Sequence, residues 1–86
     1  MNAPAILWAR GVRVGGAIEK GVLLQLAAAA NDDGVCLISR ADLAQRAELS
    51  RSAVERVLIT LGANGFIRRV VAAEYVEIEL LMGKPR

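Results

Sequence analysis

The chain has 86 residues, of which 55% are hydrophobic and 23% are charged. This length supports one hydrophobic core, and the composition excludes an intrinsically disordered segment. Cys36 is the single cysteine and histidine is lacking, which argues against an internal disulfide and a zinc site. We therefore expect neither a metal nor a cofactor. The net charge of +2 neither requires nor excludes a nucleic-acid partner.

The sequence lacks the patterns of membrane and secreted proteins. Its longest apolar run, residues 22–30 with Gln25 inside it, is shorter than the roughly 20 residues that a membrane-spanning helix needs. The first four residues lack the basic cluster that opens a secretory signal. We expect a cytoplasmic protein without membrane contact.

Residues 1–16 precede the first clear helical pattern and leave two structures open. Glycines in this region indicate flexibility or a tight turn. Residues 6–14 form either a short helix that buries Trp8 in the core or an extended arm that reaches a partner subunit. A lone tryptophan more often anchors a core, which favours the helix.

Residues 17–30 predict the first long helix, which ends at the turn-forming residues 31–34. Its three polar side chains do not line one face, so the helix is apolar nearly all round. Apolar surface that one small core leaves exposed needs cover. The surplus of apolar residues here and in residues 1–16 therefore predicts a homodimer.

A strand and two closely spaced helices follow. Residues 35–38 predict a strand, and Ser39 then begins a capping-box pattern that opens a helix over residues 40–47. After a turn of about three residues, Ser50 is the predicted N-cap of a helix over residues 51–64, whose apolar residues repeat at helical spacing.

The C-terminal part predicts a hairpin. Gly65 is expected to close the preceding helix in a left-handed conformation. Residues 66–71 and 75–80 are rich in β-branched and aromatic residues and should pair antiparallel, whereas residues 83–86 form a loose tail. The predicted fold is mainly α with a small β-hairpin, a three-helix core plus wing, with the domain spanning residues 17–82.

Two helices joined by a short turn and followed by a hairpin are the arrangement that presents a helix to the DNA major groove. Ser50, Arg51 and Ser52 lie at the positive end of helix 51–64, which favours a phosphate. Arg56, one turn further, has the donor fork that reads guanine, and Glu55 is a candidate acceptor from cytosine.

Three further arginines are predicted to contact the DNA backbone. Arg40 begins the first helix of the pair, where it would meet phosphate across the groove. Arg68 and Arg69 lie on the hairpin and would contact the flanking backbone. Glu77 and Glu79 alternate on an exposed strand face, which indicates a solubility role or pairing with Arg68 or Arg69.

The stretch from Leu23 to about Leu80 resembles the winged helix-turn-helix domains of bacterial and phage replication initiators and transcription regulators. The resemblance lies in an Ala-rich helix that ends in an Asn-Asp-Gly turn, in the Leu49-Ser50-Arg51 motif, and in Leu61, Gly65 and Ile67. It implies a winged helix-turn-helix fold that binds duplex DNA by sequence and has no enzymatic activity.

The sequence departs from that family pattern at three places. Glu48 occupies the turn position where glycine is common, which predicts backbone strain and a negative charge facing the groove. Ala53 replaces a frequent threonine, and the wing tip, residues 72–74, has no basic side chain. We therefore expect a wing with a structural role.

The alternative function is a winged-helix module that binds protein, such as a small phage or plasmid inhibitor or adaptor. The near-neutral charge, the two glutamates near the presumed groove face, and an exposed Ile59 all suit a protein partner. An enzyme is not expected, because Ser39 and Ser50 have no histidine or nearby lysine to activate them.

Overall fold

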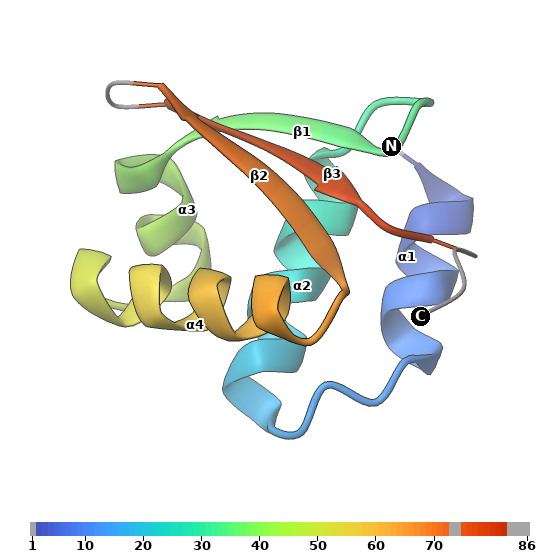
Figure 1. Ribbon diagram of the computed structural model, residues 1–86, viewed down its shortest axis with the longest axis horizontal. Helices are drawn as coiled ribbons and strands as arrows, with labels where there is room; N and C mark the ends of the chain where they lie inside the picture. The colour runs from blue at the N-terminus through green and yellow to red at the C-terminus, as the bar shows by residue number, and fades with distance from the viewer. Residues whose placement is uncertain (1, 73–74, 83–86) are drawn as a thin grey trace.

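The computed structural model describes residues 2–72 and 75–82, which form helices packed against one side of an antiparallel sheet (Figure 1). The elements are α1 (Ala3–Gly11), α2 (Ala17–Ala29), β1 (Val35–Ser39), α3 (Arg40–Ala47), α4 (Arg51–Ala63), β2 (Ile67–Ala72) and β3 (Tyr75–Leu80). The predicted fold class, mainly α with a small β wing, is confirmed. No helix in these two ranges is long and apolar enough to cross a membrane.

The N-terminal segment is a helix, so the prediction of a short helix is confirmed and the extended arm is wrong. Helix α1 spans Ala3–Gly11 and not the predicted residues 6–14. It begins earlier because the buried Asn2 caps it, and it ends earlier because Val12 is already extended. The Asn2 side chain accepts a hydrogen bond from the Ala5 amide at 3.0 Å and donates one to the Asn31 carbonyl at 2.6 Å. Trp8 is partly buried against the core, as expected.

Lys20 holds the other end of α1. Its Nζ atom donates hydrogen bonds to the carbonyl oxygens of Ala9 at 2.9 Å, Arg10 at 3.0 Å and Val12. These carbonyls belong to the last turn of the helix and the residue after it, where a cation is favourable. A side chain from the start of α2 thus completes the end of α1.

Helix α2 lies at the centre of the fold, and other parts of the same chain cover it. Helices α1, α3 and α4 and strand β1 all pack against it, and its inward side chains are Val22, Leu23, Leu26 and Ala27. This cover explains why the helix is apolar nearly all round without a second subunit. The homodimer stays a prediction, with Leu7 and Ile18 as large apolar side chains left exposed on α1 and α2.

The sheet has the order β1-β3-β2, so the hairpin gains a third strand. The predicted antiparallel pairing of the hairpin is confirmed, with Ile67 opposite Leu80 and Ala72 opposite Tyr75. Strand β1 pairs with the other side of β3, where Cys36 lies opposite Ile78. Cys36 is fully buried, as predicted for a small apolar side chain.

Helices α3 and α4 end in the same hydrogen-bonded motif. At the end of α3, the Glu48 amide donates to Gln45 and the Leu49 amide to Ala44, while Glu48 has φ 57° and ψ 43°. This is the Schellman motif, which needs a left-handed residue. The structure thus places Glu48 in a left-handed conformation, which strains a residue other than glycine, in agreement with the strain predicted for this turn.

Gly65 is the left-handed residue after α4, with φ 82°. Its amide donates to Gly62, and the Phe66 amide donates to Leu61. The predicted closure of the helix by Gly65 is confirmed. Since Phe66 is also buried, the motif directs the chain straight from α4 into β2.

Candidate nucleic-acid interface

Helix α4 begins at Ser50, as predicted. The Ser50 hydroxyl oxygen accepts a hydrogen bond from the Ala53 amide at 3.1 Å and lies 3.3 Å from the Ser52 hydroxyl. One side of the helix is buried in the core through Val54, Val57, Leu58 and Leu61. The packing of this side fixes which side of α4 faces outward.

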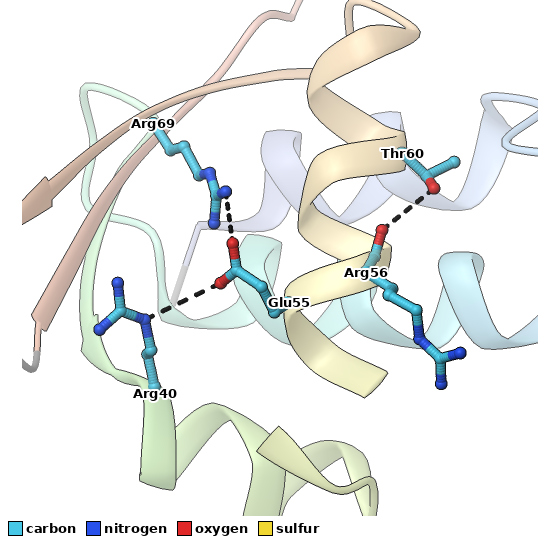
Figure 2. A network of polar contacts seen from close by, with 5 residues as sticks. All are labelled: Arg40, Glu55, Arg56, Thr60 and Arg69. Carbon is cyan, nitrogen blue, oxygen red and sulfur yellow. Dashed lines mark hydrogen bonds and ion pairs between the residues drawn. The ribbon is translucent and has the colours of Figure 1, made fainter. Parts of the chain in front are cut away.

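The outward side of α4 is polar in its first two turns. Arg51, Ser52 and Arg56 are exposed there, followed by Ile59, which is 55% exposed. Figure 2 shows the Arg56 guanidinium extending away from the helix, on a different side from Glu55. Ser52 and Arg56 therefore project outward, as the predicted interface requires.

Thr60 belongs to the same exposed side but was not among the predicted residues. It lies one turn after Arg56, and its hydroxyl donates a hydrogen bond to the Arg56 carbonyl oxygen at 3.0 Å (Figure 2). The spacing of four residues was the available signal for it. A shallow hollow of about 270 Å³ beside it is lined by Ile18, Glu19, Leu49, Ala53, Arg56, Val57 and Thr60.

Glu55 points to the opposite flank, where it joins two arginines (Figure 2). Its Oε2 atom accepts a hydrogen bond from Arg69 Nη2 at 2.6 Å, and its Oε1 atom lies 3.9 Å from Arg40 Nε. The hydrogen bond from Arg69 lowers the pKa of the Glu55 carboxyl and outweighs the opposing effect of partial burial. The same bond raises the pKa of Arg69.

This cluster changes the interpretation of three predicted contacts. Both carboxylate oxygens of Glu55 face arginines of the same chain, so Glu55 is not presented as an open acceptor for cytosine. Arg40 and Arg69, predicted as phosphate contacts, turn toward Glu55 with side chains that are only 26% and 21% exposed. The helical pattern placed Glu55 on a flank of α4 but did not show which element covers that flank.

Arg68 lies apart from the cluster, on the outer face of the sheet. It is opposite Glu79 in the strand register, and its Nη2 and Nε atoms donate to one Glu79 oxygen at 2.7 and 3.0 Å. The expected pairing of a hairpin arginine with Glu79 is confirmed. Because side chains alternate across a strand, Arg68 and Arg69 face opposite sides of the sheet, and Arg68 is 74% exposed.

Two of the sequence predictions lie outside the described residues. Ala73 and Glu74 of the wing tip are not described, and neither is the predicted tail at residues 83–86. Among the residues that are described, no cluster of three or more histidine, cysteine or acidic side chains has the geometry to hold a metal ion.

One comparison with known proteins identifies the family. The family model for the IclR helix-turn-helix domain matches residues 21–70, which is more than half of the chain and runs from α2 into β2. No curated protein and no solved structure gave a significant match. The matched segment contains α3, the turn at Glu48, and α4 with its exposed Ser52 and Arg56. The chain therefore belongs to the IclR helix-turn-helix family, whose members are winged helix-turn-helix DNA-binding domains of the transcription-regulator type.

Proposed function

We propose that this protein binds duplex DNA by sequence, as a transcription regulator or a phage or plasmid replication factor, by inserting α4 into the major groove. The observation that carries the proposal is the two-sided character of α4. Its apolar side is buried, while Ser52 and Arg56 project from the opposite side. A helix supported in this way fits a groove about 12 Å wide.

The N-terminal end of α4 supplies the phosphate contacts in this proposal. Arg51 and Ser52 are exposed beside the cap residue Ser50, and the first turn contains no acidic side chain. The positive end of the helix dipole and the N-terminal amides attract an anion at the same place. These contacts set the register of α4 on the duplex and are independent of base sequence.

Arg56 is the proposed base reader. Its exposed side chain begins one turn into α4, where a recognition helix is deepest in the groove, and its guanidinium fork matches the O6 and N7 acceptors of guanine. Thr60 lies on the same side and is a further candidate for contact with a base edge or a thymine methyl group.

Arg68 is the proposed backbone contact of the wing. It is the more exposed of the two hairpin arginines, at 74% against 21% for Arg69. Its ion pair with Glu79 partly neutralises the positive charge that would attract a phosphate. The contribution of Arg68 to DNA affinity should therefore be smaller than that of Arg51. Arg40, Glu55 and Arg69 contact one another and are therefore not among the proposed DNA contacts.

The proposal also includes a cytoplasmic homodimer. The support is the exposure of Leu7 on α1 and Ile18 on α2, since apolar side chains left uncovered on a small domain favour association. A dimer would place two copies of α4 on half-sites about one or more DNA turns apart. Sedimentation analysis of the free protein and of its DNA complex measures this directly.

The second candidate function is protein binding, which one observation favours. Ile59 is 55% exposed on the outward side of α4, where an apolar side chain suits a protein interface as well as a thymine methyl group. A protein partner would make binding less dependent on the salt concentration than a duplex would. Salt dependence therefore separates the two functions.

The test is binding to random and selected duplex DNA at several salt concentrations. DNA binding predicts a steep loss of affinity with salt, with a slope that falls by about 0.9 for each phosphate contact removed. Arg51→Ala should weaken binding to all sequences alike, whereas Arg56→Ala should reduce preference at one base pair by about 1–3 kcal/mol.

Arg10→Ala is the matched control, because Arg10 is an exposed arginine on α1. Helix α1 lies on the far side of the molecule from the N-terminal end of α4 (Figure 1). The control variant removes the same charge and should leave the base preference unchanged. Lack of affinity for any duplex at low salt would reject the proposal in favour of a protein partner.

A further inference from the structure

The glutamate of α4 connects three separate elements at one point. Glu55 is on α4, Arg40 is the first residue of α3, and Arg69 is on the inner face of β2. We propose that Glu55 is a positioning residue that sets the orientation of α4 relative to the wing, and so governs base discrimination without touching a base. This inference rests on the proposed DNA-binding function.

The chain path shows what the ion pair would control. Strand β2 leaves the C-terminal end of α4 through Gly65 and Phe66 and runs back above the helix, so that the two elements diverge from a common corner (Figure 1). The bond between Glu55 and Arg69 bridges the open side of this corner, between residues 14 positions apart. It therefore restrains the angle between the recognition helix and the wing.

The cluster is better suited to hold a position than an ordinary surface ion pair. The bond between Arg69 and Glu55 is short, at 2.6 Å, and joins two charged groups. The Arg69 side chain is 21% exposed, and its Nη1 atom is buried without a hydrogen-bond partner among the described residues. Since Nη1 has no such partner, the hydrogen bond from Nη2 to Glu55 is what holds this guanidinium in place. Its loss would leave a largely buried cation uncompensated.

Arg40 adds a second restraint, between α4 and α3. Its Nε atom lies 3.9 Å from Glu55 Oε1, whereas Arg69 binds Oε2 of the same carboxylate. The Glu55 side chain of α4 thus contacts both α3, the other helix of the helix-turn-helix, and β2 of the wing. Neutralisation by two arginines also reduces the repulsion between this glutamate and DNA phosphates, which explains how a negative charge is tolerated beside the groove face.

The test compares Glu55→Gln with the natural protein on a duplex selected from random sequences and on random duplex. Glutamine keeps the size of the side chain and removes its charge. We expect affinity for random duplex to be equal or higher, because one negative charge is lost. The ratio of selected to random affinity should fall roughly tenfold, which corresponds to about one misread base pair, with the loss spread over several positions.

Two further variants are tested by the same ratio of selected to random affinity. Arg69→Lys keeps the charge of the partner but lacks the guanidinium fork, and it should lower discrimination in the same way. The double variant should be no worse than the more affected single variant, because both remove one interaction. Glu77→Gln is the control, since Glu77 is exposed on the outer face of the same hairpin, and it should leave the ratio unchanged.

Each outcome has one meaning when circular dichroism establishes the folded fraction of every variant. Loss of preference at a single base pair would show that Glu55 is a base acceptor and would overturn the inference. An unchanged ratio, or equal losses on both duplexes in proportion to unfolding, would overturn it as well. Should the natural protein bind no duplex at low salt, the proposed function fails first and the inference falls with it.

Discussion

Replacement of Glu48 by glycine should stabilise the protein, and the structure contains its own reference for the effect. Helices α3 and α4 end in the same Schellman motif, but the left-handed residue is Glu48 in one and Gly65 in the other. The φ angles of these residues are 57° and 82°. The two positions thus differ mainly in the presence of a β-carbon.

The magnitude follows from two opposing effects. The left-handed conformation costs a residue with a β-carbon roughly 1–2 kcal/mol, and glycine avoids this cost. Glycine loses more backbone entropy on folding, which takes back about 0.5–1 kcal/mol. The net gain for Glu48→Gly is about 0.5–1 kcal/mol in the free energy of unfolding. In a domain of this size it corresponds to an increase in Tm of roughly 2–8 °C.

Thermal and urea unfolding, followed by circular dichroism, measure the gain. Glu48→Ala is the matched variant, because it removes the charge but keeps the β-carbon and the strain, so its stability should stay close to that of the natural protein. Gly65→Ala should lower stability by about 1 kcal/mol through the same physics in reverse. Equal stabilisation by alanine and glycine at position 48 would refute the argument and assign the effect to charge.

The remaining predictions concern three other side chains. Lys20→Met should reduce the free energy of unfolding by about 1–2 kcal/mol through loss of the carbonyl contacts at the end of α1. By contrast, Arg13→Met, at an exposed position between α1 and α2, should change it by less than about 0.5 kcal/mol. The lowered pKa of Glu55 means that its ion pair contributes fully above its ordinary pKa, at a pH of about 4.5. The difference in urea midpoint between the natural protein and Glu55→Gln should therefore shrink as the pH falls below that value. Burial raises the pKa of the Cys36 thiol, so a thiol reagent at pH 8 should react only as fast as the protein opens, and faster in urea.

Local sequence signals predicted most of the helix-turn-helix. Helix α3 has the predicted bounds, and α4 ends one residue before its predicted end. The Ser39 and Ser50 hydroxyls make the predicted cap bonds. These features depend on residues a few positions apart, such as a cap and the apolar repeat that follows it. The hairpin was equally predictable, because its two strands are adjacent in the chain.

Features that depend on distant residues were harder to predict. Helix α1 was only one of two alternatives, because its ends are held by Asn31 and Lys20, far along the chain from the groups they contact. The pairing of β1 with β3 joins residues about 40 positions apart. No local pattern in either strand specifies that partner, since strand propensity reflects packing in the finished sheet.

The position of Glu55 shows how this limit affects the assignment of function. On the helical wheel it lies beside Arg56, and both have groups that pair with bases, so the sequence alone supports two base readers. The fold separates them, because β2 returns along one flank of α4 and brings Arg69 within 2.6 Å of Glu55. Arg56 extends on a different side of the helix and is exposed. Two adjacent side chains that can both pair with bases thus receive different roles, one toward the groove and one toward the wing, from the direction in which the chain leaves the helix.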